Sequence, residues 1–303
     1  YMAIRRGPLA EPESATDVFA ISTGAGTDAP LWTSNFPIDM AMNRDVSSAV
    51  DTNIVSRLTG TNRLETNTTD AEVSSNASKM DYMDGYHEGT LNLPTYYSWM
   101  WKRAPSYFDV VAYTGTGSNR TISHNLGAVP EMIWVKRRNT INNWKTFHSS
   151  LGGTKSMELN TTVAAETNGS ALWNSTAPTA SVFSLGTASD VNGSGSTYIA
   201  YLFATVAGVS KVGSFSHTSG QTQNIDCGFS SGARFVLVKQ RGSTGAWFVY
   251  DTTRGIVAGN DPRIKLDDTS AQNTSNDDID PLSSGFTLTT NFSGGDYIFY
   301  AIA

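Results

Sequence analysis

Apolar and polar side chains alternate along several short stretches of the chain. In residues 132–137, MIWVKR, the side chains of Met132, Trp134 and Lys136 fall on one face of an extended chain and the intervening side chains on the other. In residues 97–102, YSWMWK, the aromatic rings share a face in the same way. A period of two predicts β-strands in both stretches.

Other stretches complete a prediction of an all-β protein. Residues 198–203, YIAYLF, are apolar on both faces and rich in aromatic and β-branched types, which favours a central strand. Clusters of Gly, Ser, Thr and Asn supply the turns between strands. The polar stretch NTTVAAETN, residues 160–168, predicts a single helical turn capped by Thr161 or Thr162.

A ring-rich segment recurs along the chain and divides it. The copies are YSWMWKRAP at residues 97–105, YIAYLFATVAG at 198–208 and YIFYAIA at 297–303, with a fourth, YMAIRRGP, at 1–8. Cutting after each copy gives three segments: 1–105, 106–207 and 208–303. Because 303 residues exceed the usual size of a single core, three domains are the expectation.

The second and third segments correspond almost throughout. EMIWVKRRNTINNWKTFH at residue 131 matches RFVLVKQRGSTGAWFVYD at residue 234, with a Lys after Val and a Trp after a polar turn. The first segment diverges: Asn43 stands near the Lys position, and the hairpin with the Trp is absent. We predict three tandem antiparallel β-sandwich modules of about 100 residues each, the first divergent, joined by short connections into a stiff rod.

Composition and charge narrow the function. The formal net charge is -6 and the pI is near 5.2, which argues against nucleic acid or an anionic membrane as a partner. The sequence contains no apolar run of the about 18 residues that a membrane helix needs, so membrane insertion is not expected. The single cysteine, Cys227, excludes an intrachain disulfide and is expected to be a partly buried thiol.

The recurring blocks resemble a known family. The ring-rich strand, the VP-EMIWVKRR block with its Trp, the G-TK-x-L-x-NTT-A-E stretch and the F-S-L-G strand are similar to tandem repeats in tail-fibre and other virion structural proteins of tailed bacteriophages, marine ones especially. The resemblance covers the second and third segments and the latter half of the first. It implies a structural protein of the virion that is assembled in the host cytoplasm into a tail or fibre that meets the host surface. It also implies self-association as a homotrimer, contacts with other virion proteins, and a first segment that is either a sandwich or a docking variant.

The same residues give little support to catalysis. The histidines His87, His124, His148 and His217 lack the spacing of a metal site, and no serine-nucleophile context is present. The densest acidic clusters are KLDDTS at residue 265 and NDDIDP at residue 276, and neither recurs in the second segment. We expect no enzyme activity and no cofactor. The alternatives are a calcium site at Asp277, Asp278 and Asp280, a glycan-degrading tail spike that uses such acids, and a capsid decoration or connector protein without a receptor.

Aromatic side chains near polar turns are the candidates for binding a host glycan. Trp144 and Trp247 follow polar turns, and Trp173 has no counterpart in the third segment. An exposed ring could stack on a sugar, with Asn142, Asn143 or His148 as hydrogen-bond partners and Tyr250 as a further candidate. The alternative, which the recurrence of Trp144 and Trp247 favours, is that each Trp anchors its hairpin to the sandwich.

Overall fold

The computed structural model describes residues 9–24, 29–74, 78–89 and 94–303. In these residues nearly all regular structure is antiparallel β-sheet, which confirms the all-β prediction. The helical elements are single turns: η1 (Ala15–Asp17), η2 (Ser149–Leu151) and α1 (Ser189–Asn192). In this described part, no helix is long and apolar enough to cross a membrane. The fourth ring-rich stretch, residues 1–8, lies outside the described residues.

The strands of the first segment form one large and one small sheet. The large sheet has the order β1-β9-β3-β4-β5-β6 and the small one β2-β8-β7. Their bounds are β1 (Phe19–Thr23), β2 (Trp32–Thr33), β3 (Met40–Asp45), β4 (Asn53–Ser56), β5 (Asn62–Glu65), β6 (Val73–Ser74), β7 (Ser78–Lys79), β8 (Gly85–Glu88) and β9 (Tyr96–Trp101).

The second segment repeats this arrangement. Its large sheet has the order β10-β17-β12-β13-β14-β15, and β11 pairs with β16 in a small sheet. The bounds are β10 (Phe108–Thr114), β11 (Arg120–Ser123), β12 (Met132–Arg137), β13 (Lys145–His148), β14 (Lys155–Glu158), β15 (Glu166–Thr167), β16 (Val182–Leu185) and β17 (Thr197–Phe203).

The third segment has a large sheet of order β18-β25-β20-β21-β22 and a small sheet of order β19-β24-β23. The bounds are β18 (Ser210–His217), β19 (Gln223–Asp226), β20 (Phe235–Gln240), β21 (Trp247–Asp251), β22 (Ile264–Lys265), β23 (Ile279–Leu282), β24 (Gly285–Leu288) and β25 (Gly295–Ile302). In every large sheet the ring-rich strand, β9, β17 or β25, lies between the first strand of its segment and β3, β12 or β20 respectively.

The central strands of each large sheet are buried on both faces. In the second segment, Ile133 and Val135 pack with Phe183 of the small sheet, as a sandwich requires. The alternate side chains Met132 and Trp134 belong to a different core cluster. The alternation predicted for residues 132–137 is therefore confirmed, and it directs the two faces of one strand into two separate cores.

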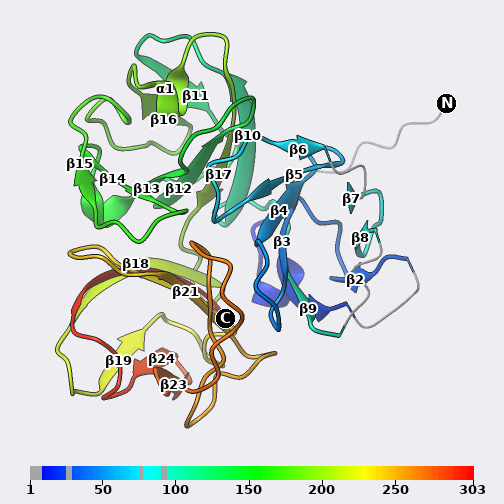
Figure 1. Ribbon diagram of the computed structural model, residues 1–303, viewed down its shortest axis with the longest axis vertical. Helices are drawn as coiled ribbons and strands as arrows, with labels where there is room; N and C mark the ends of the chain where they lie inside the picture. The colour runs from blue at the N-terminus through cyan, green and yellow to red at the C-terminus, as the bar shows by residue number, and fades with distance from the viewer. Residues whose placement is uncertain (1–8, 25–28, 75–77, 90–93) are drawn as a thin grey trace.

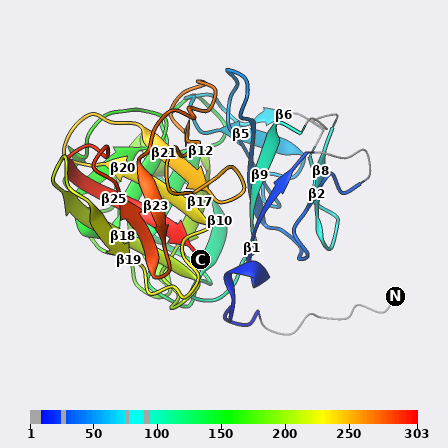
Figure 2. The same cartoon turned by 90° about the horizontal axis from the view of Figure 1, so that it is seen from below.

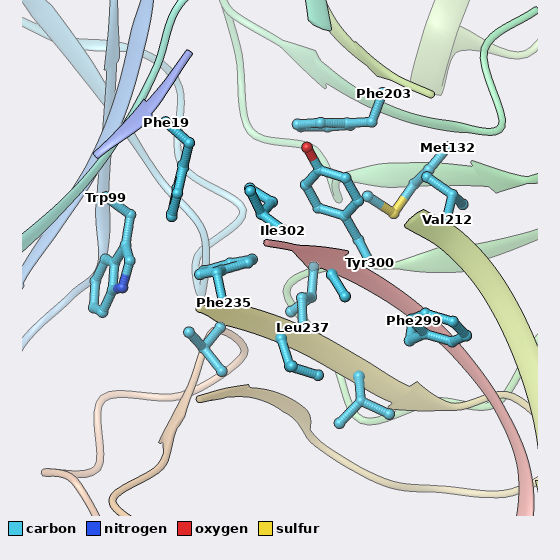
Figure 3. Packing of buried hydrophobic residues seen from close by; sticks show 14 of the residues in the cluster. Phe19, Trp99, Met132, Phe203, Val212, Phe235, Leu237, Phe299, Tyr300 and Ile302 are labelled. Atoms are coloured by element: carbon cyan, nitrogen blue, oxygen red, sulfur yellow. The ribbon is translucent and has the colours of Figure 1, made fainter. Parts of the chain in front are cut away.

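The second core includes residues of all three segments: it fills the space between them and continues into the interior of the third segment, at Phe286 and Leu288 of its small sheet. Figure 1 shows the segments as three lobes around a centre, and the view from below separates the first segment from the other two (Figure 2). At the centre, Phe19 of the first segment packs against Phe235 of the third with ring centroids 5.4 Å apart, and Phe203 of the second packs against Tyr300 at 5.1 Å (Figure 3). Such aromatic pairs add about 0.5–1.5 kcal/mol each to the effect of burial.

Two expectations from the sequence are wrong. The segments do not form a rod, because one face of each large sheet is apolar and the neighbouring segments cover it. The predicted helical turn in residues 160–168 is absent: the stretch begins with a turn and a bend, has no regular structure over residues 162–165, and then forms β15. The division into three separate domains stays a prediction, since a shared core crosses all of the proposed boundaries.

Candidate functional site

Two of the candidate aromatic side chains lie where one segment meets the next, in contacts that we call seams. Between the second and first segments, the indole N–H of Trp144 donates to the carbonyl of Glu65 at 2.9 Å. Beside it, the Lys136 ammonium donates to the carbonyl of Thr69 at 3.1 Å. Both side chains are 0% exposed, so neither can reach a ligand in solution.

The seam between the third and second segments has the same construction. The indole N–H of Trp247 donates to the carbonyl of Glu158 at 2.8 Å. The Lys239 ammonium donates to the carbonyl of Thr161 at 3.3 Å and also to that of Gly245. These contacts help to explain why residues 160–168 are not helical: the Thr161 carbonyl accepts from Lys239 of the neighbouring segment and not from a backbone amide of its own helical turn.

The seam between the first and third segments is made with a different residue. Arg44 donates through Nη1 to the carbonyls of Lys265 at 2.8 Å and Asp268 at 3.1 Å, and through Nη2 to that of Ser270. Thr52 stands where the other segments have Trp, and its hydroxyl accepts from Arg44 at 3.3 Å. One guanidinium therefore reaches the carbonyls that a Lys and a Trp reach together at the other seams, because it carries five donors in a planar fork.

Strand register places these cations at equivalent positions. Lys136 lies opposite Ile199 of β17, and Lys239 lies opposite Ile298 of β25. Arg44 lies opposite Tyr97 of β9, at the same distance from the end of its ring-rich strand. Asn43, which the sequence places near the Lys position, directly precedes it: Arg44 holds that position, and Asn43 lies on the other face of β3 and donates to Glu88 at 2.5 Å.

Equivalent backbone hydrogen bonds occur at all three seams. At each seam an amide of the acceptor loop donates to a carbonyl two residues after the buried cation, at 2.8–2.9 Å; the pairs are Glu72 to Arg138, Ala165 to Arg241 and Gln272 to Val46. Each acceptor loop is also held by its own side chain, an Asn or Asp that accepts from the backbone N–H of the residue at the Trp position; the pairs are Asn67 with Thr52, Asn160 with Trp144 and Asp267 with Trp247. Through their seam side chains the second segment donates to the first, the third to the second and the first to the third, so the three segments form a closed ring.

Burial sets the protonation of the seam lysines. It lowers the pKa of Lys136 to about 8, and it lowers that of Lys239 to about 8 as well. Asp70 and Asp267 oppose the shift of Lys136 and Lys239 respectively, but burial outweighs both. Carbonyl oxygens accept from each ammonium, which offsets part of the cost of burying it.

The other candidate residues are also part of the framework. His148 is 0% exposed, and its Nδ1 accepts from the backbone N–H of Ser150 at 3.2 Å. Burial, with the charge of Arg241, lowers the pKa of His148 to about 4. Trp173 is 2% exposed and donates its indole N–H to the carbonyl of Lys155 at 3.2 Å. Trp173 also packs edge-on against Phe147, at 5.9 Å between ring centroids.

Tyr250 contacts the acidic cluster at residues 276–281. The Tyr250 hydroxyl, 0% exposed as a residue, donates to the Asp278 carboxylate at 2.9 Å, and Arg263 forms an ion pair with the same oxygen. A calcium site at Asp277, Asp278 and Asp280 therefore loses one of its carboxylates to a buried ion pair. Among the described residues no group of His, Cys, Asp and Glu side chains could hold a metal ion.

Glycan stacking on Trp144, Trp173, Trp247 or Tyr250 does not fit this structure, because all four rings are buried. The recurrence in the sequence correctly marked Trp144 and Trp247 as framework side chains. It did not identify Arg44 as the cation of the third seam. A cation one position after Asn43 was the available signal. Cys227 is buried as expected, and burial raises the pKa of its thiol to about 12.

The first segment also carries two neighbouring hollows on its surface. They measure about 460 and 360 Å³ and share Leu9, Lys102 and Arg103 among their lining residues. Lys102 and Arg103 directly follow β9, at the position where Ala204 and Thr205 follow β17. These two cations are therefore not part of the recurring framework.

Comparison with known proteins gives one match. The model of a family described as a domain of unknown function (DUF7483) matches residues 16–303, which include all three large sheets and all three seams. The chain belongs to this family. No curated protein and no solved structure matches the DUF7483 chain.

Proposed function

We propose that the chain is a structural protein of the virion of a tailed bacteriophage, in a tail fibre or at the tail tip, and that it contributes to host attachment without catalysis. The observation that carries the proposal is the place of the recurring residues. Lys136 and Trp144, with their counterparts in the third segment, lie in the blocks that resemble tail-fibre repeats, and they make the seam contacts. Asn160, in the same blocks, holds the acceptor loop of its own segment. The shared pattern thus serves assembly, as expected for an architectural protein.

The acidic clusters support a role without catalysis. Asp267 accepts from the backbone N–H of Trp247 at 2.6 Å, and Asp278 is paired with Arg263. Both acids therefore have structural partners. We assign docking on other virion proteins to the first segment, where Lys102 and Arg103 line hollows that the repeat pattern does not require.

The first test is the place of the chain in the particle. Particles from infected cells would be purified on a density gradient, analysed by mass spectrometry and labelled with antibody raised against the purified chain. We expect the chain in the particle fraction and the label on the tail. A chain that stays in the soluble lysate would contradict the proposal.

The second test separates attachment from cleavage. Purified chain is expected to reduce phage adsorption to host cells without releasing reducing ends from host polysaccharide. Release of reducing ends that is lost in Asp277→Asn or Asp280→Asn would favour the tail-spike alternative instead. Absence of any effect on adsorption, with the label still on the particle, would favour the connector alternative.

A further inference from the structure

The two surfaces that meet at each seam are different, so the interface between segments has a direction. Every segment has a donor side, with its buried cation, and an acceptor side, with the loop that follows β5, β14 or β22. The second segment uses both: Lys136 and Trp144 donate to the first segment, and the carbonyls of Glu158 and Thr161 accept from the third. A head-to-tail interface of this kind either propagates without end or closes into a ring, depending on the rotation between units.

Here the rotation closes after three units that belong to one chain. The donor side of the first segment, Arg44, reaches the acceptor loop of the third, at Lys265, Asp268 and Ser270. Thr66 of the first segment adds a hydrogen bond from its hydroxyl to the carbonyl of Leu266 at 2.6 Å. All three donor sides and all three acceptor loops are therefore occupied by partners from the same chain.

We infer that one copy of the chain is the complete threefold unit: the seam surface fits a repeat of the same kind, and Arg44 closes the ring so that no second copy takes part. In this inference the threefold arrangement is built inside one chain, whereas the resemblance implies a homotrimer of separate chains. The inference rests on the seams alone and is independent of the proposed place in a virion.

Arg44 is the residue that makes the third seam possible. The first segment lacks the Trp, and a Lys at this position would leave the carbonyl that the indole reaches elsewhere without a donor. Arg44 is 0% exposed, and burial lowers its pKa because desolvation disfavours the charged form. Asp268 and Asp51 favour its charged form, while the nearby Arg254 opposes it.

The mass of the protein in solution tests directly whether the three segments of one chain close the ring without a second copy. Light scattering after size exclusion, over a hundredfold range of concentration, is expected to give a single species at the monomer mass of 32.5 kDa. A species of three times that mass, or a mass that rises with concentration, would overturn the inference.

Substitutions at Arg44 and Thr52 test the role of Arg44 in closing the third seam. Arg44→Met is expected to lower the urea midpoint of unfolding, and Arg44→Lys combined with Thr52→Trp, which copies the other two seams, is expected to recover most of the loss. The matched control is Arg120→Met, since the Arg120 side chain donates to the carbonyl of Thr114 in its own segment. An Arg44→Met midpoint equal to that of the control, or a double variant no more stable than Arg44→Met, would show that Arg44 does not close the ring. If Arg44→Met does not fold, Arg44→Lys alone is compared with the double variant by the same criterion.

Discussion

The indole N–H of Trp99 donates to the carboxylate of Asp251 at 3.0 Å, across the seam between the first and third segments. Asp251 also forms an ion pair with Arg254 at 2.5 Å, and the two side chains are 0% and 1% exposed. Arg254 in turn lies over the Trp99 ring, 5.4 Å from its centroid. A hydrogen bond, an ion pair and a cation–π contact thus share three residues at the seam that no direct chain connection joins.

Removal of Asp251 is expected to be costly. Asp251→Ala leaves the Arg254 guanidinium buried without a counter-charge, so we expect a loss of about 3–5 kcal/mol in the free energy of unfolding. Trp99→Phe removes one hydrogen bond to a charged acceptor and is expected to cost about 1.5–3 kcal/mol. Urea denaturation followed by circular dichroism measures both. An Asp251→Ala variant as stable as the native chain would show that this pair is not buried in solution.

The two tryptophans at equivalent seams should respond alike. Trp144→Phe and Trp247→Phe each leave a backbone carbonyl, that of Glu65 or Glu158, without its indole donor. We expect each to lower the free energy of unfolding by about 1–3 kcal/mol. A loss at one position and none at the other would contradict the equivalence of the seams.

The seam lysines give a pH dependence with a defined sign. Burial lowers the pKa of Lys136 to about 8 from an ordinary value of 10.5, so between these pH values the unfolded chain binds more protons than the folded one. The contribution of Lys136 to stability therefore rises with pH from about 8 to 10.5. Lys136→Met is expected to remove this rise, measured as the difference between variant and native chain at each pH.

Taking the difference also removes the opposing effect of Cys227. Burial raises the pKa of this thiol to about 12, which lowers stability as pH rises from 9, but it does so in both proteins. A difference between Lys136→Met and the native chain that does not change from pH 7.5 to 10 would contradict the predicted shift.

Hydrogen exchange should find the closing seam weaker than the other two. The amides of Glu72, Ala165 and Gln272 make equivalent bonds, but only the seam of Gln272 joins segments that are not consecutive in the chain. Local opening there meets less restraint, so we expect the Gln272 amide to exchange faster than the other two. Slower exchange at Gln272 than at Glu72 and Ala165 would contradict this order.

Trp173 is expected to act as a core residue and not as a ligand-binding one. Trp173→Ala should lower the free energy of unfolding by about 3–5 kcal/mol, because it empties a large buried volume. Ile141→Ala is the control: Ile141 is 69% exposed, and its replacement should change stability by less than about 0.5 kcal/mol. A Trp173→Ala variant of native stability that no longer reduces phage adsorption would restore the glycan-binding interpretation.

The sequence by itself determined the strands, their faces and their recurrence. Alternation at residues 132–137 and the apolar faces of residues 198–203 are local properties, and the structure confirms both, with β17 buried between β10 and β12. The recurrence of Trp144 and Trp247 also marked them correctly as framework side chains. Local pattern suffices here because the period of side chains along a strand does not depend on what covers the sheet.

Only the tertiary structure decided what covers the second face of each large sheet. An apolar face demands burial but does not name its partner, so a rod and a ring were equally compatible with the alternation. The choice of Arg44 as the cation at the third seam also depended on the tertiary structure, for a related reason. Neighbouring positions on a strand point to opposite faces. Which face of β3 needs a cation depends on the loop after β22, which is far away in the sequence and contacts β3 only in the folded chain.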